Sequence, residues 1–381
     1  MTGVDIIGVG LSRFGRQPGV SGRAMAVDSI VAALADAGLE WKDVQAAYGG
    51  SDSSGLADTL VSDLGMTGIP FTNVKNGCAT GGSALVAGYN AIRAGSADTV
   101  LVVGFDKHPR GSFDPMPMDW GLPEEIGHAG LMVTTQFFAA KIQRYMYDHG
   151  ISTGTLGLVP EKSSYNGSLN PNAWRRDRLT PAQVLSSAMV SDPLTQYMFC
   201  SPGEGAAAVV LSRRGRSHAQ GVIPVHVAGA VSSSRTYGTF EVFSPWLPPG
   251  DLSSVSTRTA GKAFEMAGIG PGDVQVAQLQ DTDSGAEIMH MAECGFCEDG
   301  EQEKLLAERH TWINGKLPVN TDGGCLANGE PIGASGLRQI HEIVTQLRGR
   351  GGARQVPGNP RVGFTHVYGA PGVSACTVLE A

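Results

Sequence analysis

The chain has 381 residues, of which 41% are hydrophobic and 17% are charged, and its formal net charge is −8. This length predicts two domains or two fused halves, and the balance of apolar and charged residues is typical of a globular protein. The negative charge and the lack of a long Lys/Arg cluster argue against a nucleic-acid partner, and no stretch is long enough to span a membrane.

The first 105 residues alternate between predicted strands and helices. Residues 4–10 form an apolar strand that has none of the features of a signal peptide. An amphipathic helix over residues 24–37 ends at a glycine, and a short strand follows at 44–48. Residues 79–94 predict a second helix, and the continuous apolar run at 99–105 predicts a strand buried between two helical layers.

The pattern changes between about residues 107 and 195, where Met, Pro and aromatic residues are frequent. We interpret this segment as an inserted, loop-rich domain over one end of the sheet. Strand-like sequence returns at 205–211, and a basic linker ends near residue 216. We therefore expect an N-terminal half over residues 1–216 and a C-terminal half over residues 217–381.

The C-terminal half repeats the order of elements in the first half. In both halves a turn of small residues leads to a helix, then a glycine, then an apolar strand. Two copies of one α/β unit would face each other across a shared site. The elements predicted in the second half are strands at 274–279, 362–366 and 374–379 and helices at 284–293 and 335–347.

Cys78 lies in the sequence KNGCATGGSAL, directly before the helix predicted at 79–94. Backbone N–H groups and the helix dipole stabilise a thiolate at such a position, and the neighbouring glycines let a carbonyl group approach the backbone. The turn could therefore provide a nucleophile or an oxyanion hole. A buried structural cysteine in a tight turn is the alternative interpretation.

The six cysteines have no spacing typical of a disulfide framework, so we expect reduced thiols and a cytoplasmic protein. Cys294 and Cys297 form an isolated CxxC pair, without the second pair that is typical of a structural zinc site. We therefore expect no metal site, and we interpret this pair as a turn after a helix.

Three C-terminal segments join the cysteine turn in an ordered series. QDTD at 280–283 and THVYGAPG at 365–372 each end a strand, and NTDGGCLANGEPIGASG at 320–336 is a glycine-rich turn into a helix. Together with NGCATGG at 76–82 and GEGAAAVVL at 203–211, they resemble the thiolase superfamily over nearly the whole chain. The resemblance is strongest to the sterol-carrier-protein-type, or lipid-transfer-protein-like, thiolases.

This resemblance implies a five-layer αβαβα fold of two duplicated halves, an inserted loop domain, a homodimer and a coenzyme A thioester as substrate, with no tightly bound cofactor. It also implies a nucleophile at Cys78 and an oxyanion hole formed by the backbone N–H groups of Cys78 and Gly369. Residues 346–349 and 354–357 match sequences of the lipid-transfer-like branch. Many members of that branch work with a small OB-fold, zinc-ribbon companion protein.

The chain departs from the thiolase pattern at three positions. Glu330 replaces the activating His, Val367 replaces the acid/base Cys, and Gln280 takes the place of the polar residue after the strand. An anionic Glu330 beside Cys78 would raise the pKa of the thiol, and Val367 cannot transfer a proton. These changes argue against Claisen chemistry by the usual route.

The remaining groups suit a reaction without an acyl-enzyme. An oxyanion hole stabilises a thioester enolate whether or not a thiol attacks, and His366 or Tyr368 can act as a general base or hydrogen-bond donor. We expect both Glu330 and His366 to lie within about one side-chain length of Cys78. We assign substrate contacts to Gln280, Asp281 and Tyr237.

Our first hypothesis is a retro-aldol cleavage of a β-hydroxyacyl-CoA, for example of a steroid side chain, which the resemblance to aldolases of the lipid-transfer-like branch implies. The second is a thiolase or acetyl-CoA acyltransferase that forms an acyl-enzyme on Cys78. The third is a non-catalytic subunit that binds acyl-CoA or lipid.

Overall fold

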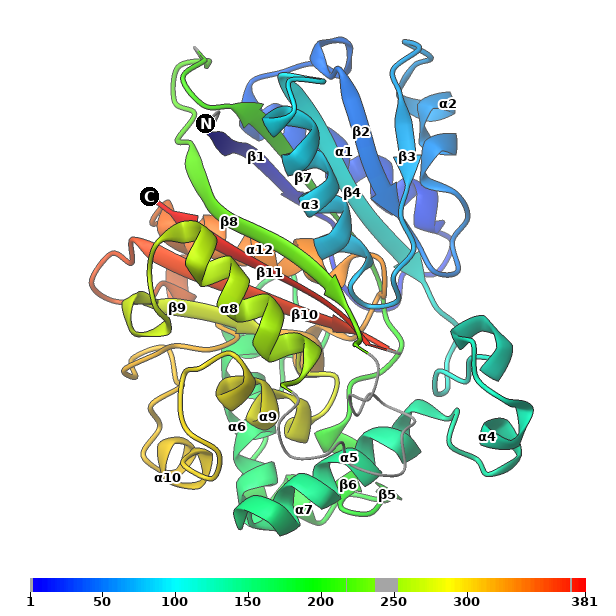
Figure 1. Ribbon diagram of the computed structural model, residues 1–381, viewed down its shortest axis with the longest axis vertical. Coiled ribbons are helices and arrows are strands. Elements are labelled where there is room, and N and C mark those ends of the chain that lie inside the picture. Colours follow the sequence, from blue (N-terminus) through cyan, green and yellow to red (C-terminus); the bar gives the residue numbers. More distant parts are fainter. Residues whose placement is uncertain (1–2, 217, 237–252, 371) are drawn as a thin grey trace.

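The computed structural model describes residues 3–216, 218–236, 253–370 and 372–381, and its main sheet has nine strands (Figure 1). The first half of the chain supplies β1 (Val4–Leu11), α1 (Gly22–Ala37), β2 (Ala46–Gly50), α2 (Val61–Leu64), β3 (Phe71–Asn73), α3 (Thr80–Arg93), β4 (Thr99–Lys107) and β7 (Glu204–Arg213).

The second half follows the same plan, with additional short helices. It supplies β8 (Val225–Ser234), α8 (Val255–Ala267), β9 (Val276–Leu279), α9 (Ser284–Glu293), α10 (Gln302–Ala307), α11 (Gly324–Asn328), α12 (Ser335–Leu347), β10 (Val362–Gly369) and β11 (Val373–Glu380).

The strand order is β3-β2-β4-β7-β1-β8-β11-β10-β9, and it is symmetric about the seam between β1 and β8. Outward from the seam, each half has two antiparallel pairings (β1–β7–β4 and β8–β11–β10) and then a parallel one (β4–β2 and β10–β9). β3 extends the first half in parallel, and a parallel bridge between Val319 and Ala277 takes the same place in the second. The two halves therefore repeat one unit, as the sequence predicted.

Helices form three layers around the two half-sheets. α1 contacts β1, β7 and β4 of the first half, whereas α8 contacts β8, β11 and β10 of the second. α3 and α12 contact each other and strands of both halves, so the half-sheets lie on either side of them. In Figure 1, α8 lies in front of β8, β10 and β11. This α-β-α-β-α order confirms the predicted five-layer fold.

Small residues let the two central helices cross closely. A Cβ atom added to Gly336 of α12 would lie 2.6 Å from the backbone nitrogen of Gly82 in α3. Any larger side chain at this point would push the helices apart. The close crossing brings together the turns that precede the two helices, which contain Cys78 and Glu330.

The segment between β4 and β7 contains more helix than we expected. Two long helices, of 16 and 17 residues, form most of it, and the second continues through Pro160. A buried ion pair between Lys162 and Glu287 attaches it to α9, and the Asn320 amide donates to the same carboxylate at 2.7 Å. Its elements are α4 (Glu124–His128), α5 (Thr134–His149), α6 (Thr153–Leu169), α7 (Pro181–Leu185), β5 (Met189–Ser191) and β6 (Leu194–Thr195).

No helix within the described residues is both long and apolar enough to cross a membrane. The division of the chain near residue 216 stays a prediction.

Residues 346–357 contain the matches to the lipid-transfer-like branch, and they connect the two halves. Arg348 extends from the end of α12 to the first half, where it donates to Asp36 Oδ2 at 2.5 Å and to the Ile7 carbonyl at 3.0 Å. The Gln346 side chain fixes the following loop through the Arg354 carbonyl at 2.8 Å. These residues therefore have a structural role within the chain.

Replacing Arg348 by Ala should lower the free energy of unfolding by about 3 kcal/mol, because the Arg348 side chain is 1% exposed and its loss removes the buried partner of Asp36 and a donor to the Ile7 carbonyl. Urea denaturation measures this change. Arg350→Ala is the matched control, since Arg350 pairs with the same Asp36 but is 46% exposed, and it should cost less than about 1 kcal/mol. Equal losses of stability in the two variants would contradict the structural role assigned to Arg348.

Candidate active site

The Cys78 turn packs directly against the end of β10. A Cβ atom on Gly369 would lie 2.2 Å from the Asn76 carbonyl oxygen, and one on Gly77 would lie 2.9 Å from the Ala370 carbonyl oxygen. Only glycines permit this approach. The backbone of Cys78 is therefore held beside Gly369, at the head of α3, where the helix dipole is positive.

Glu330 lies next to this turn and is fully buried. The Gln280 amide donates to Glu330 Oε2 at 2.9 Å, whereas Oε1 has no hydrogen-bond partner within the described part of the chain. Burial raises the pKa of the Glu330 carboxyl, although the thiols of Cys325 and Cys78, which lie beside it, act in the opposite direction. A buried carboxyl with one unpartnered oxygen can accept a proton from a bound molecule.

Burial raises the pKa of the Cys78 thiol well above its ordinary value, and the neighbouring Glu330 carboxyl raises it further. Both effects oppose the helix dipole that we expected to favour a thiolate. The thiol therefore remains protonated at neutral pH, which weakens it as a nucleophile.

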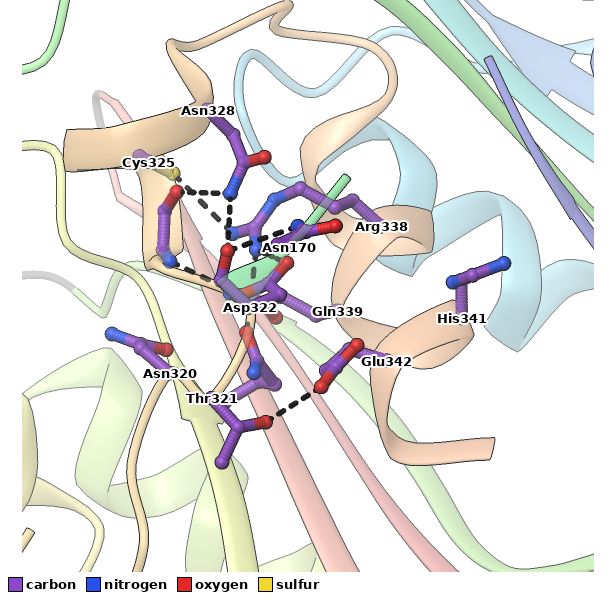
Figure 2. Close-up of polar contacts among 12 residues, drawn as sticks. Asn170, Asn320, Thr321, Asp322, Cys325, Asn328, Arg338, Gln339, His341 and Glu342 are labelled. Atoms are coloured by element: carbon purple, nitrogen blue, oxygen red, sulfur yellow. Dashed lines mark hydrogen bonds and ion pairs between the residues drawn. The ribbon is translucent and has the colours of Figure 1, made fainter. Parts of the chain in front are cut away.

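Arg338 forms its ion pair with Asp322 rather than with Glu330. The guanidinium is 1% exposed, donates to Asp322, and lies 3.6 Å from the Cys325 sulfur. Figure 2 shows Arg338 extending from α12 toward Asp322 and Cys325. Nearby, Thr321 donates to Glu342 Oε1 at 2.8 Å. This network fixes the turn from Asp322 to Glu330 and leaves the Glu330 carboxyl without a direct cationic partner.

His366 does not lie beside Cys78, so our expectation of proximity was wrong. Side chains alternate along β10, and Val367 is the residue that faces α3, where its methyl group would meet a Cβ atom on Gly82 at 2.7 Å. His366 points to the opposite face, where its Nε2 lies 2.9 Å from Ser256 Oγ and its ring 4.3 Å from the His290 ring.

Tyr368 is also directed away from the Cys78 turn. Its ring lies 6.0 Å from the His290 ring and 5.1 Å from Lys141 Nζ. Because Tyr368 and His366 both contact His290, neither supports the proton-transfer role that we assigned to it from the sequence.

The QDTD segment has mainly structural contacts, with one exception. The Gln280 side chain donates a hydrogen bond to Glu330. Asp281 caps α11 by accepting from the Cys325 backbone N–H at 2.6 Å. Burial raises the pKa of Asp281 to about 8. The residue that lines the pocket is Thr282, which we did not predict. Tyr237, our third assigned substrate contact, lies outside the described residues.

A pocket of 210 Å³ opens above Cys78. The insertion supplies much of its wall, and no spacing signal in the sequence marks these residues, since they come together only in the fold. The described lining residues are Asp52, Gly77, Cys78, Phe113, Asp114, Pro115, Trp120, Thr134, Phe138, Phe199, Cys200, Thr282, Ile332 and Ala370.

Within the described ranges, no group of three or more His, Cys, Asp or Glu side chains is arranged to hold a metal ion. Cys294 and Cys297 are both free thiols, and Cys294 is buried.

Comparison with known proteins places this geometry in context. The thiolase C-terminal domain-like family model matches residues 250–380. An acetyl-CoA acetyltransferase of Methanothermobacter thermautotrophicus is 35% identical over 98% of both chains, and the benzoylsuccinyl-CoA thiolase subunit BbsB of Thauera aromatica is 33% identical over 96% of this chain and 94% of its own. Among solved structures, the Ltp2–ChsH2(DUF35) aldolase has a TM-score of 0.85 at 22% identity, covering 100% of this chain and 98% of that one.

Replacing Glu330 by Gln should raise the thermal stability at neutral pH. Because the folded-state pKa is raised above the ordinary 4.5, the folded protein binds the proton more tightly than the unfolded chain, so stability falls as pH rises through the folded value. The amide mimics the protonated acid, and the gain, about 1 kcal/mol, should disappear below pH ~4. Thermal melts over a pH series measure this gain.

Glu303→Gln is the control with the opposite sign. Partial burial alone would raise the pKa of Glu303, but hydrogen bonds from Ser152 and Thr155 hold that pKa below its ordinary value. The substitution should therefore lower stability at neutral pH. A Glu330→Gln protein that melts lower than wild type at neutral pH would show that the carboxylate is stabilised in the fold.

Proposed function

Because the chain belongs to the thiolase superfamily and its homologues are enzymes, we propose that it is an acyl-CoA carbon–carbon lyase that cleaves a β-hydroxyacyl-CoA by a retro-aldol reaction. The observation that carries this proposal is Glu330, whose Oε1 is buried beside Cys78 without a partner among the described residues. A carboxyl with a raised pKa at this position suits a general base.

In the proposed reaction, Glu330 Oε1 accepts the proton of the β-hydroxyl group. The O–H electron pair forms a carbonyl at Cβ, the Cα–Cβ bond breaks, and its electrons move to the thioester as an enolate. The protonated Glu330 then returns the proton to Cα. The products are a carbonyl compound and a shorter acyl-CoA, and the carboxylate is regenerated.

Stabilisation of the enolate is assigned to the backbone N–H groups of Cys78 and Gly369. The packing of Gly369 against Asn76 and Ala79 keeps both amides at the head of α3. Fixed N–H donors at a developing oxyanion are a large contribution to catalysis in such sites. In this role Cys78 contributes its backbone and not its sulfur.

Acyl transfer is the second candidate, and one observation favours it. The Cys78 thiol and the Glu330 carboxyl lie side by side, so the carboxylate could accept the thiol proton and release a thiolate that attacks a thioester. The names of the homologous acetyltransferase and thiolase subunit agree with this reaction. Because the homologues are enzymes, we set aside the non-catalytic subunit of our third hypothesis.

We retain two partners as proposals. β3 forms an edge of the sheet, with Thr72 and Asn73 exposed and Met66 84% exposed nearby, and such an edge is a surface for pairing with a second copy in a homodimer. The similar aldolase structure is named for Ltp2 together with ChsH2(DUF35), which supports a partner subunit, and the resemblance implies that this partner is a small OB-fold, zinc-ribbon protein. A coenzyme A thioester remains the substrate class, and a cytoplasmic location remains our expectation.

Glu330→Gln should lower kcat for cleavage of a 3-hydroxyacyl-CoA by about a hundredfold to ten-thousandfold, the usual cost of losing an acid/base group. Release of the carbonyl product is measured in a stopped assay, with folding checked by circular dichroism. His366→Ala is the comparison, because His366 faces away from the pocket, and it should retain activity within about tenfold of wild type. A larger loss of kcat in His366→Ala than in Glu330→Gln would contradict the assignment of Glu330 as the general base.

Cys78→Ala should retain retro-aldol activity within about tenfold, because the substitution keeps the backbone N–H donor. Intact mass of the wild-type protein incubated with acyl-CoA should show no adduct. An acyl adduct on Cys78, together with loss of all activity in Cys78→Ala, would replace the lyase by the acyltransferase.

A further inference from the structure

Aromatic rings form part of the wall of the pocket above Cys78, and the cleavage step itself does not require them. The rings belong to Phe113, Trp120, Phe138 and Phe199. They come from different segments: the loop after β4, the turn before α4, α5 and the loop before β7. A hydrophobic collapse within the insertion does not by itself explain why the four rings border an open space next to the reacting groups.

Other aromatic rings pack against the rings of this wall. Phe137 lies 6.0 Å from Trp120 in an edge-to-face arrangement and 4.4 Å from Phe138. His108 packs edge-on against Phe113, with ring centroids 4.9 Å apart and an interplanar angle of 89°. These contacts are typical of stable aromatic clusters, so the pocket offers preformed ring faces and edges to a ligand.

The size of the pocket limits what it can enclose. An apolar cavity of about 150 Å³ binds one benzene molecule. The pocket above Cys78 has 210 Å³, enough for a single ring and the carbon that joins it to the reacting centre. A fused system of four rings, as in the steroid of our first hypothesis, would extend beyond this volume.

The described charged side chains that line the pocket are both carboxylates, which disfavour an acidic ligand. Asp52 and Asp114 line it, whereas Glu330 is buried beside Cys78 and is not one of the lining residues. Two exposed cations partly offset them: Lys75 lies 3.6 Å from Asp52, and Arg235 donates to the Trp120 carbonyl at 3.3 Å. A carboxylate on the bound group would therefore be repelled by the Asp52 and Asp114 carboxylates.

We propose that the group carried on Cβ of the substrate is a single uncharged aromatic ring, so that the enzyme acts on 3-aryl-3-hydroxyacyl-CoA thioesters. The identity of the reaction rests on the proposed function, whereas recognition of the ring rests on the pocket alone. Binding can therefore be tested without turnover.

The test compares two thioesters that the enzyme cannot cleave, 3-phenylpropanoyl-CoA and butanoyl-CoA, by isothermal titration calorimetry with the full chain. The ring should make 3-phenylpropanoyl-CoA bind about tenfold tighter, because edge and stacked contacts add to the burial of its surface. Adding a carboxylate to the ring, in 3-(4-carboxyphenyl)propanoyl-CoA, should remove this advantage.

Substitutions locate the effect in the pocket. Phe138→Leu and Trp120→Leu should each reduce the preference for the phenyl thioester severalfold, with little change in the affinity for butanoyl-CoA. Tyr147→Ala is the control, because Tyr147 is on the same helix as Phe138 but is 85% exposed, and the preference should not change. Thermal melts verify that each variant is folded.

Equal affinities for the phenyl and butanoyl thioesters would overturn the proposal, and so would undiminished binding of the carboxyphenyl thioester. If Phe138→Leu weakened the binding of free coenzyme A as much as the binding of the phenyl thioester, the pocket would hold the pantetheine arm. The proposal would then also fail. Tight binding of the phenyl thioester by an enzyme that does not cleave 3-hydroxy-3-phenylpropanoyl-CoA would contradict the lyase reaction and leave the ring preference standing.

Discussion

The close crossing of α3 and α12 is the constraint on which the site depends. Gly82 and Gly336 bring the two helices to backbone contact, and each helix begins at a turn that carries a reactive group. The two half-sheets lie on either side of this crossing, and Arg348 ties the end of α12 to β1. Since the two turns belong to different halves, Cys78 and Glu330 meet only when the duplicated units are assembled.

The electrostatics of the crossing favour a carboxyl group that can change its protonation state. The buried cation nearest in the network, Arg338, is paired with Asp322, and Glu330 receives one amide hydrogen bond, from Gln280. Burial of an incompletely paired acid costs stability, and such costs are typical of functional sites. The same carboxyl raises the pKa of the Cys78 thiol, so one residue both provides a base and weakens the neighbouring nucleophile.

Much of the fold could be predicted from the sequence, because apolar periodicity and glycine positions are local signals. The helices at 284–293 and 335–347 have the predicted bounds, and the duplicated order revealed the two halves. His366 was misplaced because a motif gives the order of residues along a strand but not which face each one takes, and on β10 the site-facing residue is Val367. Thr282 and the aromatic wall could not be predicted, since they converge from distant segments.

The proposed chemistry requires Glu330 to be a buried acid poised to exchange a proton beside Cys78. An infrared titration tests this requirement. The band of protonated carboxyl groups is followed against pH in wild type and in Glu330→Gln, and the spectra of the variant are subtracted from those of wild type. A difference band that persists above pH ~4.5, the ordinary range for Glu, and disappears only at higher pH would agree with the raised pKa. A band lost at or below that pH would show a carboxylate stabilised by its surroundings, and would contradict the role of Glu330 as a base.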